Sequence, residues 1–242
     1  MLDKPKTTTA DIVKRCEDLF TDLTFTAARE WKAAKPGRIV VGFMPYYAPR
    51  ELVHAAGGLP LGIFGGGDQL EVIHGDAYYQ SYICRIPRST IELGVSGRLD
   101  FVDGMMFPSI CDVIRNLSGM WKLMFPNKGA RYIDLPHNFE DDLGGEFYRS
   151  ELKETCHWLE GMTGRPITDD ALRASIAVFN ENRRLIRELY ELRSAEPWNA
   201  PSSEVYLLLR AGMVIPVEDH NKMLRDYVDT ARQQTRPIKD NS

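Results

Sequence analysis

The chain has 242 residues, a formal net charge of −4 and a hydrophobic content of 43%. That length suits one large domain, or one domain with an appendage, and the composition is typical of a folded globular protein. A mildly acidic chain lacks the strongly basic face expected of a general nucleic-acid binder. No run approaches the roughly 20 apolar residues that cross a bilayer, and residues 1–16 lack the apolar core of a signal peptide. We therefore expect a cytoplasmic protein, whose four cysteines are reduced or bound to metal.

Short apolar runs alternate with helical patterns over the first part of the chain. The apolar runs predict strands at 38–44, 59–64, 101–107 and 130–136. The helical patterns predict helices at 9–33, 49–56, 76–96 and 109–124, the third of them interrupted by Pro87. Strands that alternate with helices imply a parallel sheet with right-handed crossovers. The sequence therefore predicts an α/β fold, a Rossmann-like parallel sheet with flanking helices.

A helical region follows the predicted sheet. Thr168 is a good cap for a helix over 168–193, whose apolar residues fall near one stripe. Two further helices are expected over 202–214 and 217–234. We therefore predict an α/β domain over 1–144 and a helical region over 145–242.

Two cysteines lie in unusual surroundings: Cys84 in YYQSYICRIPRSTIELG (78–94) and Cys111 in DGMMFPSICDVIRNLSGMW (103–121). Ligands of parallel sheets bind beyond the carboxyl ends of the strands, and Cys111 falls in the predicted first turn of the helix after the third strand. A helix N-terminus favours the thiolate, which is the form that binds iron. Two such thiolates can hold part of an iron–sulfur cluster, but free cysteines are also common packing residues. Position and charge alone do not decide between these two interpretations.

Arginines accompany both cysteines. Arg85 and Arg88 follow Cys84, and Arg115 lies one helical turn beyond Cys111. Their charge can offset that of a thiolate-bound cluster or bind the phosphates of a cofactor. The alternative is that they only solvate the faces of amphipathic helices.

Further candidate residues follow the first two predicted strands. Tyr46, Tyr47, Arg50 and Glu51 can line a pocket after the first strand, with turn packing and helix-start charge as their alternative roles. The glycines at 65–67 permit close backbone approach, but they match neither a GxGxxG motif nor a P-loop. Any ATP used with this protein is therefore expected to be hydrolysed on another chain. The candidate substrate-binding residues are Tyr46, Arg50, Glu51, Arg85, Arg88 and Arg115.

The other two cysteines, Cys16 and Cys156, lie in predicted helices without ligand-like surroundings, and we interpret both as packing residues. The histidines show no metal-ligand spacing. The sequence thus offers two candidate ligands, whereas a [4Fe–4S] cluster normally needs three or four from the protein.

Three segments resemble the benzoyl-CoA reductase and 2-hydroxyacyl-CoA dehydratase family. GFMPYYAPRELVHAAGGLPLGIFGGGD (42–68) resembles its first-strand motif, and the two cysteine segments resemble its N-terminal cluster-cysteine motifs. The likeness runs from about residue 10 to the end of the chain. Within the family it is greatest to the gamma (C) subunits of ATP-dependent benzoyl-CoA reductases.

The resemblance implies that Cys84 and Cys111 are ligands of a [4Fe–4S] cluster close to a coenzyme A thioester. It also implies a sister subunit with a similar cluster, activator subunits that hydrolyse ATP, and ferredoxin as electron donor. The reaction implied is the two-electron reduction of benzoyl-CoA to a cyclic dienoyl-CoA, a step of anaerobic aromatic degradation. The sequence does not identify the proton donor.

Members of this family continue into a second α/β domain that supplies a third cluster cysteine, and the present sequence stops before it. By the family's pattern, this chain alone is therefore expected to hold an incomplete cluster site and to be inactive in isolation. Two alternatives remain. The chain can belong to a 2-hydroxyacyl-CoA dehydratase, which uses similar clusters for radical elimination of water, or it can be a truncated, non-catalytic interaction subunit.

Overall fold

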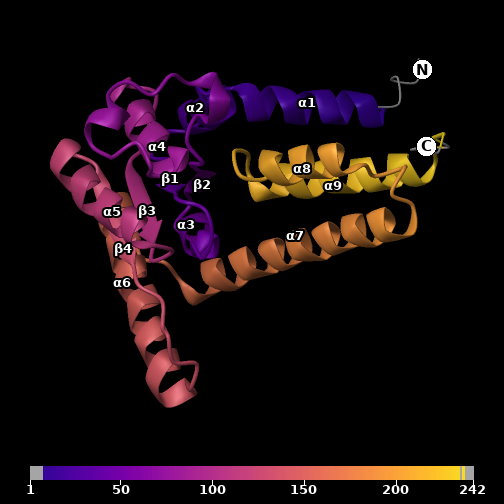
Figure 1. Cartoon of the computed structure of the whole chain (residues 1–242). Helices are drawn as coiled ribbons and strands as arrows, with labels where there is room; N and C mark the ends of the chain where they lie inside the picture. The colour runs from indigo at the N-terminus through magenta and orange to yellow at the C-terminus, as the bar shows by residue number, and fades with distance from the viewer. Residues whose placement is uncertain (1–7, 235, 238–242) are drawn as a thin grey trace. The chain divides into compact units, whose positions relative to one another are not determined.

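The computed structural model describes residues 8–234 and 236–237, so the outermost residues of both predicted parts lie outside the described chain. Within these residues the chain forms a four-stranded parallel sheet with flanking helices, followed by further helices (Figure 1). The predicted fold class is therefore confirmed. The chain divides into two compact units, one of Leu23–Ser175 and one of Met1–Asp22 with Ile176–Ser242. The predicted domains, 1–144 and 145–242, divide the chain elsewhere and stay a prediction.

The sheet belongs to the first of these units. Its strands are β1 (Val40–Phe43), β2 (Leu59–Gly62), β3 (Gly104–Pro108) and β4 (Gly129–Ile133). All pairings are parallel, and the strand order is β2-β1-β3-β4. Each strand overlaps its predicted run. The central strands β1 and β3 are buried along their whole length, whereas the edge strand β4 is mostly half-buried.

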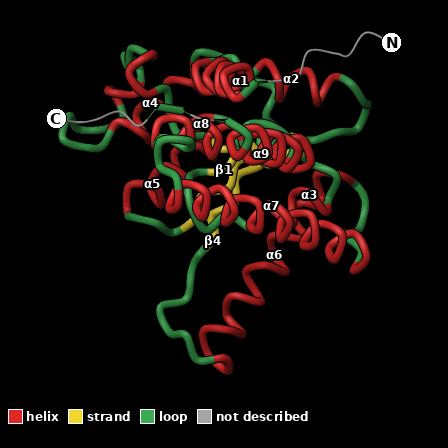
Figure 2. Tube along the Cα trace, turned by 90° about the vertical axis from the view of Figure 1, so that its right-hand side faces the viewer, coloured by secondary structure: helices red, strands yellow, loops and turns green. Residues whose placement is uncertain are grey.

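The helices of the sheet-bearing unit are α2 (Thr26–Ala33), α3 (Arg50–Ala55), α4 (Arg85–Val95), α5 (Asp112–Met124) and α6 (Glu146–Thr163). The other unit contains α1 (Thr9–Thr21), most of α7 (Asp169–Ala195), α8 (Ser202–Ala211) and α9 (Val217–Arg232). Figure 2 colours these elements by type, with the short strands in yellow. The amide of Ala171 donates to Thr168 Oγ1 at 3.2 Å, which confirms the predicted cap of α7. No α-helix of the described residues is long and apolar enough to cross a membrane.

Both faces of the sheet are covered by helices. On β3, the ring of Phe107 packs against Trp121 of α5, with their centroids 6.0 Å apart. A Cβ added at Gly104 would instead meet Trp158 of α6 at 2.9 Å. Successive residues of a strand point to opposite faces, so Gly104 and Phe107 face opposite sides. Helices α5 and α6 therefore cover opposite faces of the sheet.

The other unit is a packing of helices around apolar side chains. Cys16 of α1 is buried, with its Sγ 3.3 Å from Sδ of Met223 on α9. The hydroxyl of Tyr227, also on α9, donates to Glu204 of α8 at 2.6 Å. Cys16 therefore packs within this unit, as predicted.

The single helix predicted over 9–33 is wrong. Helix α1 ends at Thr21, and α2 begins at Thr26. Between them, Asp22 is extended and the buried Phe25 adopts a left-handed conformation with φ of 55°. A non-glycine residue with positive φ cannot continue a right-handed helix, so one helix ends before Phe25 and another begins after it.

The helix predicted over 76–96 begins later than expected. Residues 78–84 are irregular after a short 3₁₀ turn at Gly75–Ala77, and α4 begins at Arg85. Pro87 is the third residue of α4, where the missing N–H would have had no partner inside the helix. Pro87 therefore belongs to the start of the helix and does not interrupt it.

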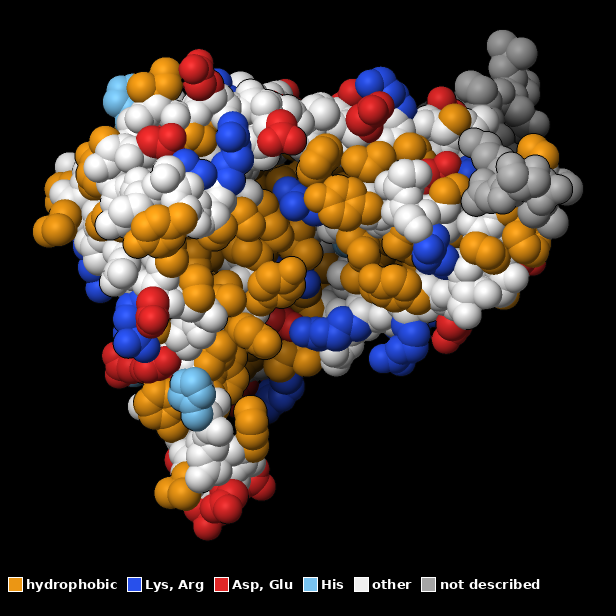
Figure 3. Space-filling model, in the orientation of Figure 1, with side chains coloured by type: hydrophobic (Ala, Val, Ile, Leu, Met, Phe, Trp, Pro, Cys, Tyr) orange, Lys and Arg blue, Asp and Glu red, His pale blue; other side chains and the backbone are white. Residues whose placement is uncertain are grey.

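The segment between β4 and α6 exposes apolar side chains among acidic ones. Phe139 is 89% exposed and Leu143 is 59% exposed. Glu140, Asp141 and Asp142 are exposed beside them, and acidic side chains gather at the lower end of the view in Figure 3. Large apolar side chains in such an exposed position are typical of surfaces that contact another protein.

Helices α4 and α5 approach closely at Gly94. A Cβ at this position would lie 2.8 Å from Cζ of Phe125 and 3.0 Å from Cη2 of Trp121. The Trp121 and Phe125 rings are themselves packed at a centroid distance of 4.4 Å, which leaves them little room to move.

We therefore predict that Gly94→Ala lowers the free energy of unfolding by about 1–3 kcal/mol, because overpacking outweighs the better helix propensity of alanine. Gly119→Ala, on an open face of α5 with nothing within 4 Å, is the matched control. It should raise stability by up to about 1 kcal/mol. Denaturant unfolding of both variants measures the difference, and equal stabilisation by both would contradict the proposed close approach.

Candidate functional site

The strand order places a topological switch point between the carboxyl ends of β1 and β3. From β1 the chain passes to β2 on one side of the sheet, and then crosses to β3 on the other side. Ligands of open parallel sheets bind at such a switch point. The segment 44–49 follows β1, and the segment 109–111 follows β3. Tyr46 and Cys111 therefore leave the sheet at neighbouring strand ends.

Both candidate cluster cysteines are N-cap residues. Cys84 precedes α4, and Cys111 precedes α5, so Cys111 lies one residue before the first turn in which it was predicted. Both side chains are exposed and carry free thiols. The unpaired amides and the dipole of a helix N-terminus favour negative charge. Each position is therefore suited to a thiolate ligand.

Tyr79 links the two segments that carry the cysteines. Its hydroxyl donates to the main-chain oxygen of Val113, in the first turn of α5, at 3.2 Å. The pKa of this phenol is raised above its usual value, first by burial and then by the negative charge of Cys111 and Cys84. The Tyr79–Val113 bond therefore joins the segment before Cys84 to the first turn of the helix that follows Cys111.

No third ligand joins this pair within residues 8–234 and 236–237. In that part of the chain, no group of three or more His, Cys, Asp or Glu side chains is arranged to hold a metal ion. Cys156 is half-buried on α6, and burial raises the pKa of its thiol. The two N-cap cysteines fit two ligand positions of a [4Fe–4S] cluster, and such a cluster normally takes three or four from the protein.

The irregular segment before Cys84 is held by the buried carboxylate of Glu92. It accepts the amides of Ile73, His74 and Gly75 at 3.0, 2.7 and 3.0 Å, and it contacts Nδ1 of His74 at 2.9 Å. Burial opposes ionisation of Glu92, but the bonds from His74, Gly75 and Ile73 outweigh it, so its pKa lies below the usual value. Three consecutive amides on one carboxylate fix the start of this segment to α4.

Two of the predicted arginines bind the stretch between β2 and α4. Arg85 donates to the main-chain oxygens of Gly67 and Leu70 at 2.8 and 2.6 Å. Arg88 forms an ion pair with Asp76 at 2.7 Å. The structure therefore shows both arginines anchoring loops around Cys84, and their predicted role in substrate binding stays a prediction.

The third predicted arginine, Arg115, lies beside Cys111. Its guanidinium lies over the ring of Tyr132, and its Nε donates to the Tyr132 hydroxyl at 3.2 Å. Arg115, Cys111, Asp134 and Tyr132 line a small cavity of about 180 Å³. Of the three predicted arginines, Arg115 is the one that this cavity places next to a candidate cluster cysteine.

The residues after β1 have unusual backbone geometry. Tyr46 and Tyr47 are both left-handed, with φ of 71° and 53°, and their side chains are 71% and 65% exposed. Such conformations cost energy in non-glycine residues and concentrate at functional sites. Arg50 and Glu51 begin α3 directly after this turn, and the Glu51 main-chain oxygen accepts from Ser175 at 2.8 Å. Substrate binding by Tyr46, Arg50 and Glu51 stays a prediction.

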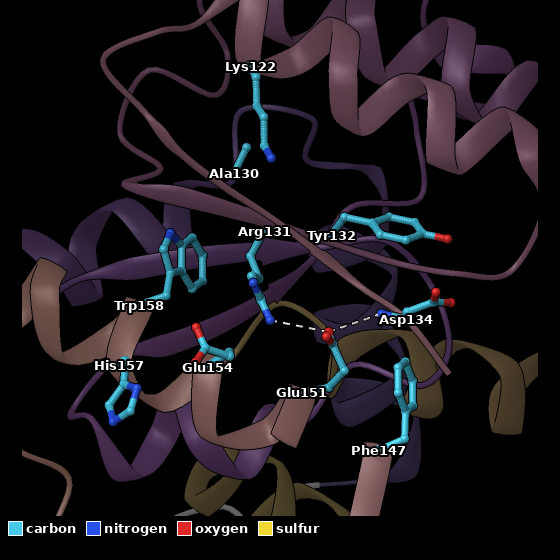
Figure 4. Close-up of a pocket in the computed structure, with 10 residues that line it drawn as sticks. All are labelled: Lys122, Ala130, Arg131, Tyr132, Asp134, Phe147, Glu151, Glu154, His157 and Trp158. Atoms are coloured by element: carbon cyan, nitrogen blue, oxygen red, sulfur yellow. Dashed lines mark hydrogen bonds and ion pairs between the residues drawn. The ribbon is translucent and has the colours of Figure 1, made fainter. Parts of the chain in front are cut away.

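A larger groove adjoins the Cys111 cavity and shares Tyr132 and Asp134 with it. It has a volume of about 700 Å³ and runs between β4, α5 and α6 (Figure 4). Arg131 and Glu151 meet within it at 3.2 Å, and Glu151 also accepts the amide of Asp134 at 3.3 Å. The charges at the centre of this groove therefore pair with each other.

Sequence reasoning missed Tyr79, Glu92 and the segment after β4. Asp134 and His137 line the cavity beside Cys111 and follow the fourth strand. Ligands bind beyond the carboxyl ends of parallel strands, and this rule applies to β4 as it does to the first three strands. The position of Asp134 and His137 after β4 was therefore a signal in the sequence. Tyr79 and Glu92 gave no such signal, because their partners lie far along the chain.

A sequence model of the protein family described as "2-hydroxyglutaryl-CoA dehydratase, D-component" matches residues 45–242. The chain is 66% identical over 96% of its length to the C subunit of benzoyl-CoA reductase of Thauera aromatica, covering 60% of that protein. It is 31% identical over 78% of its length to the beta subunit of (R)-2-hydroxyglutaryl-CoA dehydratase of Acidaminococcus fermentans, covering 50%. It is 28% identical over 80% of its length to the (R)-phenyllactyl-CoA dehydratase beta subunit of Clostridium sporogenes, covering 51%. The chain thus spans between 50% and 60% of the length of these three relatives.

The contacts of Glu92 predict a pH-dependent contribution to stability. Its folded pKa lies below the ordinary value of 4.5, so its contribution is present above about pH 4.5 and is lost as the pH falls through the folded pKa. Glu92→Gln should lower the free energy of unfolding by about 1–3 kcal/mol at pH 7. The difference from the native chain should shrink below pH 4.5.

Denaturant unfolding at several pH values checks this prediction. Glu71→Gln, an exposed change in the same segment, is the matched control and should have little effect. A Glu92→Gln deficit that does not change with pH would show that the carboxylate charge is unimportant.

Proposed function

The chain belongs to the 2-hydroxyglutaryl-CoA dehydratase D-component family, and we propose that it is part of an iron–sulfur subunit of a benzoyl-CoA reductase. The observation that carries the proposal is the pair of exposed cysteines at the N-termini of α4 and α5, whose segments are joined by the Tyr79–Val113 hydrogen bond. The 66% identity to the C subunit of a benzoyl-CoA reductase supports the choice of reaction within the family.

In this proposal Cys84 and Cys111 supply two ligands of a [4Fe–4S] cluster. Such a cluster, when bound, supplies single low-potential electrons for the reduction of an aromatic ring. The amides and dipoles at the start of α4 and α5 stabilise the negative charge of the two thiolates. A third ligand is expected from outside the described residues.

The substrate is proposed to bind at the switch point between β1 and β3. Tyr46 and Tyr47 present large aromatic surfaces there, and aromatic side chains suit the flat ring of a benzoyl group. Arg115, beside Cys111, offers a cation to an anionic part of a coenzyme A thioester. The product of the proposed reaction is a cyclic dienoyl-CoA.

The proposed subunit works within a larger assembly. We propose a sister subunit with a similar cluster, an activator that hydrolyses ATP, and ferredoxin as electron donor. The exposed Phe139 and Leu143 support the presence of a protein partner, because exposed side chains of this size are typical of contact surfaces.

A dehydratase subunit is the second candidate, because the family and the relatives at 28% and 31% identity carry dehydratase names. Both reactions would use the same two cysteines. They differ in substrate, so the groups near Tyr46 are where the two functions should separate. A non-catalytic interaction subunit is the third candidate, and it predicts that neither cysteine affects iron content.

We predict that Cys84→Ser and Cys111→Ser each remove most of the iron from the complete subunit after anaerobic reconstitution, because each deletes a thiolate ligand. Iron and sulfide analysis and EPR of the reduced protein measure the loss. Cys156→Ser, on α6, is the control and should retain the iron. Full iron content in both N-cap variants would refute the ligand assignment and favour the non-catalytic alternative.

We further predict that Tyr46→Ala raises KM for benzoyl-CoA roughly tenfold in the assembled enzyme, because an exposed aromatic contact to the ring is lost. Steady-state assays with benzoyl-CoA and with a 2-hydroxyacyl-CoA measure this effect and separate the two reactions. Tyr190→Ala, at a 49% exposed position on α7, is the control. Turnover of the 2-hydroxyacyl-CoA alone would assign the chain to a dehydratase.

A further inference from the structure

We propose that Tyr79 is a positioning residue that fixes Cys84 and Cys111 relative to each other, by tying the segment before Cys84 to the first turn of α5. This inference rests on the proposed function, since it concerns the two cysteines as a pair of metal ligands. It assigns Tyr79 no direct part in the chemistry.

The tie is a single hydrogen bond between elements that each carry one cysteine. The Tyr79 hydroxyl donates to the main-chain oxygen of Val113 at 3.2 Å. Tyr79 lies five residues before Cys84, and Val113 lies two residues after Cys111. A carbonyl oxygen has two lone pairs, so Val113 can accept this bond and still take part in the helix. Because the ring is half-buried, the bond is partly shielded from water, which strengthens it.

The segment that carries Tyr79 is anchored to α4 at its start, so the Tyr79 end of the hydrogen bond to Val113 is held in place. Glu92 binds three consecutive amides at 73–75, and Arg88 pairs with Asp76 at 2.7 Å. Both anchors belong to α4, which begins directly after Cys84. Tyr79 extends this attachment to α5 and thereby couples the two helix N-termini.

At the far ends of the same helices, Gly94 of α4 packs against Trp121 of α5 and against Phe125, the residue that follows this helix. Packing at one end and the Tyr79 bond at the other leave the two helices little freedom to separate. The pair of thiols is therefore preorganised before any metal arrives, and preorganised ligands bind more tightly because less order is lost on binding.

Co²⁺ is the probe for this pair, because thiolate ligands bind divalent transition metals and give a charge-transfer absorption with cobalt. The whole 242-residue chain is titrated anaerobically with Co²⁺ alone, and the thiolate-to-cobalt band reports the affinity. Tyr79→Phe keeps the ring and removes only the hydroxyl. We expect it to weaken Co²⁺ binding about two- to tenfold, which corresponds to the loss of one net hydrogen bond.

Tyr82→Phe is the matched control, because it removes the same group from a ring in the same segment that is 80% exposed. It should bind Co²⁺ as the native chain does. The thermal midpoint of Tyr79→Phe should stay within a few degrees of native, which separates positioning from general loss of structure. Tyr79→Met, which also lacks the hydroxyl, should reproduce the weaker binding and replaces Tyr79→Phe if that variant does not fold.

Two outcomes overturn the inference, and they are distinguishable. In the first outcome, the native chain shows a cobalt–thiolate band, and the double change Cys84→Ser with Cys111→Ser abolishes it, so the cysteines bind as a pair. If Tyr79→Phe then binds Co²⁺ as tightly as the native chain, Tyr79 does not position the ligands. If the native chain shows no such band, or the double variant keeps it, the cysteines do not form a pair, and the proposed ligand set fails together with the role of Tyr79.

Discussion

The candidate site depends on the parallel pairing of β1 with both β2 and β3. Because β1 is central, its carboxyl end is flanked by the strand ends that lead to the two cysteine-bearing helices. The chain from β2 must cross β1 to reach β3, and α4 is part of that crossover. A right-handed crossover places its helix on a fixed face of the sheet. The sheet order therefore decides that Cys84 and Cys111 start neighbouring helices on one face.

Polar side chains of α4 hold the segment between β2 and α4, whose conformation the sheet does not determine. The segment between β2 and α4 lacks regular structure over most of its length, so few of its amides have partners in a helix or a strand. Glu92 provides partners for three of them, while Arg85 serves the oxygens of Gly67 and Leu70. This arrangement changes the role of the arginines near Cys84. Their positive charge is directed toward the loops on either side of Cys84.

The parts of this architecture that rest on local patterns were predictable, and those that rest on distant contacts were not. The strands were found because short apolar runs between glycines and prolines are typical of buried parallel strands. The break at Phe25 was missed, since 9–33 reads as one helical pattern and a left-handed phenylalanine has no sequence signature. The late start of α4 was missed for a related reason. Its preceding segment is stabilised by Glu92, which lies 18 residues beyond His74.

The two cysteines also show how much of the candidate site the sequence predicts. The helix-start position of Cys111 followed from sequence to within a residue, whereas Cys84 was expected inside a helix over 76–96 and instead precedes α4. The link between the two segments depends on strand order and on the Tyr79–Val113 bond, which a single sequence does not reveal. Both thiols are exposed, and so are Tyr46 and Tyr47 beside the switch point. A cluster held here in water would have its potential set largely by solvent, because exposure and hydrogen bonds to sulfur control that quantity. The proposed low-potential role in aromatic ring reduction therefore requires that a further protein surface cover the two thiols at this edge of the sheet.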